Sequence, residues 1–125
     1  MKICSSKIFC LLLFLFLNHS VIKAQCYVAD YATSRRVLNI VGDYVVDYSS
    51  NRRLYKFNGE YIIDYNSYRK LLKFDGQYII RYSDYRRIAK LQGDYLVENQ
   101  SYRRVAKLGC PGGRSALAAA AYYLN

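Results

Sequence analysis

The sequence has little of the chemistry that most enzymes require. Its single histidine, His19, lies within the first two dozen residues, so the rest of the chain has no imidazole for acid–base catalysis or for activating a nucleophile. No cluster of histidine, cysteine and carboxylate side chains has metal-site spacing, and the isolated glycines do not form a phosphate-binding loop. The sequence therefore predicts no catalytic, cofactor or metal site and argues against an enzyme.

A ten-residue apolar run, 8–17, lies near the N-terminus. Two lysines precede it, and a short polar stretch that ends at Gln25 follows it. This pattern is typical of a secretory signal peptide, and the run is short for a bilayer span. A retained anchor or a lipoprotein is an alternative, but Cys26 lacks the small residue that a lipoprotein site needs beside it. We predict a signal peptide at 1–24 and export to the periplasm, the cell surface or the medium.

Removal of that segment leaves a basic chain with two cysteines. The basic count falls from 19 to 16 while the acidic count stays at 9, so the net charge is +7. Such a charge favours anionic partners, although simple solubility would also account for it. Cys26 and Cys110 remain, and two cysteines in an oxidising compartment normally form a disulfide.

A seventeen-residue repeat fills the next part of the chain, and a fixed period of this kind defines an architecture. Pairs of basic residues at 35–36, 52–53, 69–70, 86–87 and 103–104 open the copies. In each copy two β-rich runs flank a turn such as Asn58-Gly59, which is the strongest short signal for a type I′ hairpin. Three polar residues join successive hairpins. This arithmetic places Lys56 opposite Tyr61 and pairs the recurring carboxylates with arginine, as in Arg53 opposite Asp64.

The two ends of the array predict that it closes. Cys26 begins half a hairpin and Cys110 ends the other half, and the 85 residues between and including them are five times seventeen. If the halves pair, the cysteines meet where the fifth turn would lie, and a disulfide can join them. We therefore predict an all-β fold over 25–110: a closed antiparallel barrel of ten strands from five hairpins, without free edges.

The tail, 111–125, supplies a candidate plug for this barrel. Its Pro-Gly-Gly reverses the chain, Ser115 can cap a helix, and the alanines are strong helix formers. A ten-stranded barrel has a radius of roughly 10 Å, enough for a slim helix, so we expect residues 115–124 to lie in the lumen; the alternative is a frayed tail. The face expected to line the lumen carries Val45, Phe57, Ile62, Phe74, Ile79, Leu91, Leu96 and Leu108.

This pattern of tandem hairpins with a terminal helix resembles the bacterial β-flower families, which are small, rotationally symmetric barrels. Those in turn look like the Tubby C-terminal and phospholipid-scramblase barrels, which hold a helix inside. The resemblance covers residues 26–125 and implies a helix-filled barrel. Ten strands differ from the twelve of the Tubby barrel, and no phosphoinositide-binding residues carry over to this chain.

The other face interleaves tyrosine with lysine and arginine. Such a surface can bind nucleic acid by stacking or lie at a membrane interface, or its tyrosines can simply cover basic neighbours; export argues against intracellular nucleic acid. We predict a monomeric binding module for an anionic membrane surface or glycan. The alternatives are a structural or protein-interaction domain and, more distantly, a hydrolase. The candidate surface comprises Arg52, Lys56, Tyr61, Arg69, Lys73, Tyr78, Arg86, Lys90, Tyr95, Arg103 and Lys107.

Overall fold

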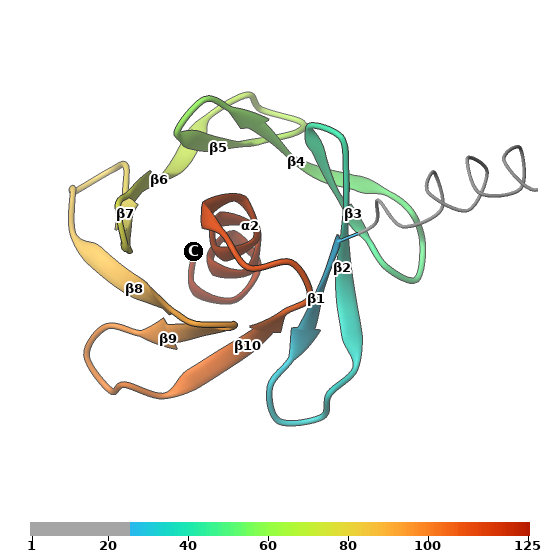
Figure 1. Cartoon of the computed structure of the whole chain (residues 1–125). Helices are drawn as coiled ribbons and strands as arrows, with labels where there is room; N and C mark the ends of the chain where they lie inside the picture. The colour runs from blue at the N-terminus through green and yellow to red at the C-terminus, as the bar shows by residue number, and fades with distance from the viewer. Residues whose placement is uncertain (1–25) are drawn as a thin grey trace, which may run out of the picture.

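The computed structural model describes residues 26–125, which form ten antiparallel strands followed by one helix (Figure 1). The predicted signal peptide at 1–24 lies outside the described residues. In chain order the elements are β1 (Cys26–Asp30), β2 (Arg36–Val41), β3 (Tyr44–Asp47), β4 (Arg53–Asn58), β5 (Tyr61–Asp64), β6 (Lys70–Asp75), β7 (Tyr78–Arg81), β8 (Arg87–Gln92), β9 (Tyr95–Glu98), β10 (Arg104–Leu108) and α2 (Gly113–Leu124).

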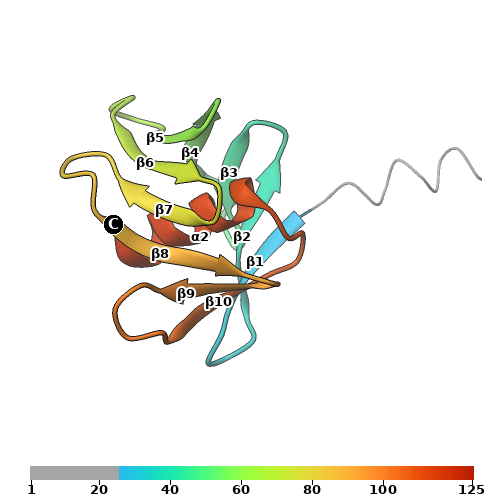
Figure 2. The same ribbon diagram turned by 60° about the vertical axis from the view of Figure 1, so that its left-hand side comes forward.

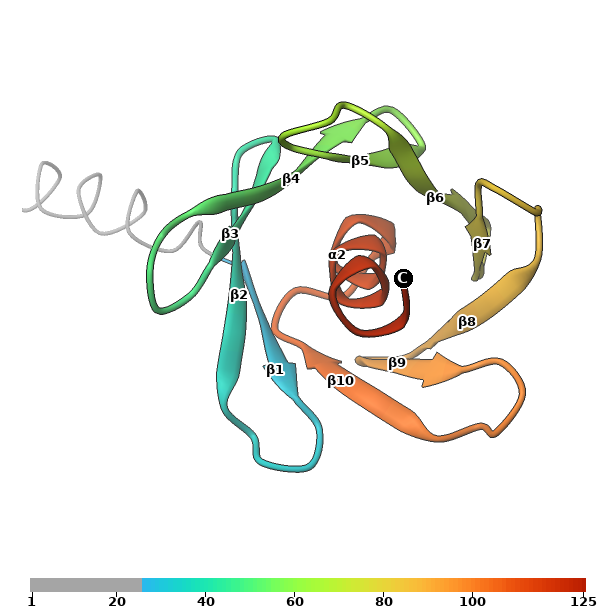
Figure 3. The same cartoon turned by 180° about the vertical axis from the view of Figure 1, so that it is seen from behind.

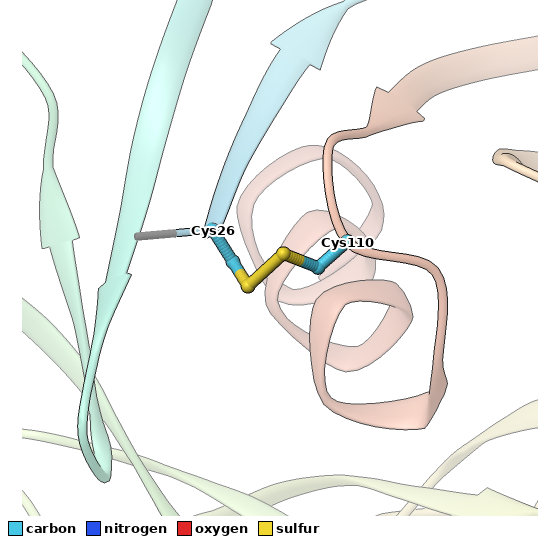
Figure 4. The surroundings of a disulfide bond; sticks show 2 residues. All are labelled: Cys26 and Cys110. Carbon is cyan, nitrogen blue, oxygen red and sulfur yellow. A yellow bond between two sulfur atoms is a disulfide. The ribbon is translucent and has the colours of Figure 1, made fainter. Parts of the chain in front are cut away.

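The strands close into a barrel, as the repeat arithmetic predicts. Each strand pairs with its neighbours in the chain, and β1 pairs with β10, with Val28 opposite Leu108. At this junction, which we call the seam, a disulfide joins Cys26 to Cys110 (Figure 4), and their Cα atoms are 5.3 Å apart. The disulfide takes the place of the peptide turn that links the other hairpin strands, so both the closure and the cysteine pairing are confirmed.

The short turns differ from the predicted type I′ geometry. The turn residues are Gly59 and Glu60, and Asn58 is the last residue of its strand, opposite Tyr61. Only the glycine has a positive φ, at 63°, as a type II′ turn requires. A type I′ turn at the equivalent Val41-Gly42 would force the β-branched Val41 into positive φ, which its side chain disfavours. The register therefore moves by one residue, and the predicted pairing of Lys56 with Tyr61 is wrong.

The longer connections also differ from expectation, because each is followed by a β-bulge. Five residues, such as 48–52, separate the strands in place of the predicted three. On β4, Arg53 pairs with Val46 and Tyr55 pairs with Val45, so Leu54 is the extra residue of the bulge. A bulge reverses the alternation of side chains along a strand. Arg53 and Lys56 consequently lie on one face, near the same Tyr44 ring, although simple alternation would separate them.

The carboxylates that precede these connections form hydrogen bonds with loop residues, and Glu98 also forms an ion pair with Arg103 at 3.4 Å. One oxygen of Asp47 accepts hydrogen bonds from the Ser50 backbone N–H at 2.9 Å and from the Ser49 hydroxyl at 2.7 Å. Hydrogen bonds from Ser49 and then from the Ser50 backbone lower the pKa of Asp47, and Asp64 has the same kind of loop partners. The predicted Arg53–Asp64 pair is wrong, because the register of the β4–β5 hairpin places Tyr55 opposite Asp64.

Helix α2 fills the lumen, as both end views show (Figures 1 and 3), and the view turned by 60° shows the strands around it (Figure 2). The four consecutive residues 118–121 are all buried. Successive side chains of a helix point about 100° apart, so burial of all four means that the barrel encloses the helix on every side. The expected lumen face is confirmed: Val45, Phe57, Ile62, Ile79, Leu96 and Leu108 belong to the buried core, with Phe74 and Leu91 packed against it.

The entry of the helix into the lumen depends on glycine and not on the predicted cap. The helix begins at Gly113, and its N-cap is Gly112, at a φ of 146° and without a side-chain hydrogen bond. Ser115 lies inside the first turn and is buried, so its predicted role as a cap is wrong. A Cβ atom at Gly113 would lie 2.6 Å from the ring of Phe74. The chain can therefore enter the barrel this close to Phe74 only where a side chain is missing.

Candidate binding surface

The outer wall of the barrel carries a row of cations separated by apolar side chains. Ile63 on β5 pairs with Lys56 on β4 and with Lys70 on β6. The same cation–apolar–cation arrangement recurs around the ring, so positive charge lies on both sides of almost every apolar position. The other members of this cation row are Lys73–Ile80–Arg87, Lys90–Val97–Arg104, Lys107–Ala29–Arg36 and, with one cation only, Asn39–Val46–Arg53.

Tyrosine rings fix the cations that follow each long connection. The guanidinium carbon of Arg53 lies 4.0 Å from the ring centroid of Tyr44, and the Lys70 ammonium lies 4.4 Å from that of Tyr61. Equivalent contacts join Arg36 to Tyr27, Arg87 to Tyr78 and Arg104 to Tyr95 at 4.0–4.4 Å. Cation–π attraction contributes about 0.5–1 kcal/mol at exposed sites. These contacts hold long side chains in one orientation before any partner arrives.

At three places a second tyrosine ring lies near the same cation. Arg53 is 6.0 Å from the ring centroid of Tyr65, and Tyr65 in turn meets Tyr44 edge to face. Lys70 has a second contact with Tyr82 at 5.6 Å, and Arg104 has one with Tyr31 at 5.9 Å. The two rings at each place touch each other, so they form a pair beside the cation, which remains exposed to the solvent.

The structure divides the sequence-predicted surface residues into two groups. The lysines and tyrosines lie on the wall: Lys56, Lys73, Lys90, Lys107, Tyr61, Tyr78 and Tyr95. The arginines lie in the long connections, exposed and one residue before the strands: Arg52, Arg69, Arg86 and Arg103.

The cations that stack on tyrosine are the second members of the basic pairs, which sequence reasoning left out: Arg36, Arg53, Lys70, Arg87 and Arg104. Arg53 and Lys56 are three residues apart, and strict alternation puts such residues on opposite faces. The bulge at Leu54 brings them to one face. A bulge leaves no simple mark in a β-rich run, so the doubled basic residues were the only signal available.

Few acids neutralise the wall. Among residues 26–125 the only ion pair that reaches the cation row is Lys73–Glu60 at 3.7 Å, and both partners remain partly exposed. Asp30 is occupied elsewhere: it accepts hydrogen bonds from the Thr33 backbone N–H and from the Tyr123 hydroxyl at 2.9 and 3.0 Å. The hydrogen bond from the Thr33 backbone is the main cause of a lowered pKa at Asp30, and the bond from Tyr123 lowers this pKa further. The wall consequently keeps a net positive charge.

The mouth of the barrel at the long connections holds a groove of about 270 Å³. It lies beside the C-terminal end of α2, and its lining residues are Arg81, Arg86, Arg87, Ile88, Glu98, Gln100 and Leu124. Strand β7 ends at Arg81, where the equivalent strands β3 and β5 end at Asp47 and Asp64. Arg81 forms an ion pair with Asp84 at 3.2 Å, which neutralises part of the added charge.

Residues 26–125 contain no group of three or more histidine, cysteine or carboxylate side chains that could hold a metal ion. In the same part of the chain, no helix has the length and apolar character needed to cross a membrane. Comparison of the chain with models of known protein families, with curated proteins and with solved structures finds no match to any of them. The resemblance to the β-flower families accordingly stays a prediction.

Proposed function

We propose that this chain is an exported, non-enzymatic binding module whose tyrosine-rich basic wall engages an anionic lipid or glycan. The observation that carries the proposal is the cation row: its positive charges recur at fixed spacing, stack on tyrosine and, within residues 26–125, form one ion pair, Lys73–Glu60. Fixed cations lose less conformational freedom when they meet an anion, so more of the electrostatic attraction remains as affinity. The Cys26–Cys110 disulfide supports export, because such bonds persist in oxidising compartments.

Removal of wall charge tests this proposal. The variant Lys56→Gln/Lys73→Gln/Lys90→Gln removes three charges from the wall and keeps long side chains in place. The matched control removes three charges from the long connections: Arg52→Gln/Arg69→Gln/Arg86→Gln.

Both variants and the parent are compared for sedimentation with phosphatidylcholine vesicles, with and without phosphatidylserine, and for retention on dextran sulfate, each at low and high salt. We expect the wall variant to lose more binding than the control, and the parent to bind weakly at high salt, where screening is strong. Parental binding by the wall variant would contradict the proposal.

A second candidate function is recognition of a protein by the long connections. Tyr68, Tyr85 and Tyr102 are 66–74% exposed in three consecutive connections, and each has a φ of 57–58°. The first two long connections have Ser34 and Asn51 at this place. Positive φ is unfavourable for a bulky residue, so exposed tyrosines here favour a role in contact. Salt-resistant capture of one protein that Tyr85→Asn and Tyr102→Asn abolish would support this function over the first.

A further inference from the structure

The outer wall has a hollow at the seam between β1 and β10. At the centre of each cation–apolar–cation unit the apolar residue is valine or isoleucine, except on β1, where it is Ala29. The smaller side chain leaves space above the sheet. A hollow of about 330 Å³ lies there, close to the lower end of the range for small-molecule sites, and its lining residues are Tyr27, Ala29, Asp30, Tyr31, Ser34, Arg36, Tyr95 and Lys107.

The walls of this seam hollow are held in place by packing. A Cβ atom at Gly109 would lie 2.6 Å from the ring of Tyr27, so that ring rests directly against the glycine backbone. Arg36 covers Tyr27 at 4.0 Å from the ring centroid. On the opposite side, Tyr31 and Tyr95 meet edge to face at 5.7 Å. The hollow therefore has two rigid aromatic sides, and a ligand would not need to order them.

The hollow has two positive charges beside Ala29 and one negative charge at the end of β1. Lys107 on β10 and Arg36 on β2 are the direct cross-strand neighbours of Ala29. Asp30 lies at the end of β1, and its hydrogen bonds with Thr33 and Tyr123 hold its pKa below the ordinary value. Asp30 thus stays ionised. Its oxygens already accept hydrogen bonds from Thr33 and Tyr123, so a ligand hydroxyl would share one of them, while the two cations beside Ala29 attract an anion. The three charged groups sum to +1.

We propose that the seam hollow binds one sugar residue that carries a carboxylate or sulfate group, as part of an anionic glycan chain. The anionic group lies between Lys107 and Arg36, and the ring hydroxyls face Asp30 and Ser34. The tyrosine rings supply flat apolar edges for the carbon side of the sugar. Beyond the hollow, the other sugars of the glycan extend along the cation row toward the next cation–apolar–cation unit. This inference rests on the proposed function and names the ligand class and the site.

The shape of the hollow favours a glycan over a lipid. The hollow lies on the convex outer side of the barrel, around β1. A flat bilayer can touch a convex wall only along a narrow strip. The floor of the hollow has one aliphatic residue, Ala29, and the other lining side chains are aromatic, hydroxylated or charged. An acyl chain would find no continuous apolar surface there, whereas the lining offers hydroxyl and charged side chains to the polar groups of a sugar.

Filling the hollow without changing its charge tests the proposal. Ala29→Ile installs the residue that stands at the equivalent positions Ile63 on β5 and Ile80 on β7. The matched control, Val46→Ile, enlarges the equivalent residue on β3. Thermal melting first establishes that both variants fold. Binding is then measured by calorimetry with a uronate-containing tetrasaccharide, with its sulfated counterpart and with neutral chitotetraose, and by sedimentation with phosphatidylserine vesicles.

We expect the parent and Val46→Ile to bind both anionic tetrasaccharides alike and chitotetraose much more weakly. Ala29→Ile should bind the anionic sugars about tenfold more weakly or worse, because the added side chain clashes with the ligand. Lys107→Gln should reproduce this loss if Ala29→Ile proves unstable.

Anionic-sugar binding that Ala29→Ile leaves unchanged would overturn the seam site and leave the wall proposal standing. If Ala29→Ile loses binding to phosphatidylserine vesicles but keeps binding to the anionic sugars, the glycan assignment is overturned. If the parent binds neither sugars nor vesicles, both proposals fail.

Discussion

Replacement of Ala119 by tryptophan tests whether the enclosed helix is essential to the fold. Ala119 has no exposed surface, and its neighbours in the helix are buried as well, so a larger side chain has no solvent to turn toward. Overpacking a closely packed core costs about 1–3 kcal/mol and occasionally more. For a domain of this size each kcal/mol lowers the melting temperature by about 4–8 °C. We therefore expect Ala119→Trp to melt at least about 4 °C below the parent.

The same helix provides a matched control. Tyr122 is 41% exposed and contacts Tyr123 at the end of α2. Tyr122→Trp introduces the same residue at a place where it can reach solvent, and we expect a change within about 0.5 kcal/mol. Melting is followed by circular dichroism with the disulfide intact, so that both variants unfold from the same cross-linked state. Equal melting of Ala119→Trp and the parent would refute the enclosed helix.

Truncation gives an independent measurement of the same feature. Deletion of residues 112–125 removes the helix and exposes the lumen side chains, among them Leu38, Leu72 and Leu96, which have no exposed surface in the intact chain. We expect the truncated chain to bind a hydrophobic dye such as ANS, which marks exposed apolar surface. Dye binding equal to that of the parent would mean that the helix does not cover the core.

Three further predictions concern the disulfide, the acidic loops and the entry of the helix. Cys26→Ser/Cys110→Ser opens a loop with a sequence separation of 84, and we expect denaturant unfolding to show a loss of roughly 4–5 kcal/mol in the chain-entropy model. Hydrogen bonds lower the pKa of Asp47 and Asp64 below 3.8 in the folded chain. The stability that they add is therefore complete well above pH 3.8 and disappears as the pH falls through the lowered values; melting between pH 7 and pH 2 should show this decline, and Asp47→Asn should flatten it. Gly113→Ala should destabilise the fold by about 1–3 kcal/mol, because its Cβ atom would lie 2.6 Å from an aromatic ring, and melting like the parent would show that the ring can move aside.

The architecture was predictable because the repeat and the cysteine positions constrain each other. A period of seventeen with half a hairpin at each end permits closure only if Cys26 and Cys110 meet, and the structure has this bond. The alanines of the tail indicated a narrow site for the helix, and the barrel supplies one. These inferences depend on the number of residues in each repeat and on the small size of alanine side chains, and both can be read directly from the sequence.

The register was not predictable in the same way, since two local features act on it together. The turn begins at glycine and not at the residue before it, and each long connection is followed by a bulged residue such as Leu54. The first change moves the pairing register by one residue, and the second changes the face on which the residues before the bulge lie. The lumen face was nevertheless correct, because hydrophobic side chains such as Phe57 and Ile62 select the buried side whatever the turn type. The tyrosine-stacked cations, such as Arg53, were missed because they lie on the far side of the bulge.

The places where the copies differ carry more information about binding than the repeat itself. The repeat explains the barrel, and a uniform wall would offer five equivalent sites. The copies are unequal: Asn39 removes one cation, and Ala29 opens a hollow beside two others. The second difference lies at the seam, where Gly109 allows Tyr27 to pack flat against the backbone. Packing against Tyr27 accounts for the glycine at 109, but it does not account for Ala29, because larger apolar residues occupy the equivalent position in every other unit. The small residue at Ala29 therefore favours a ligand at the seam.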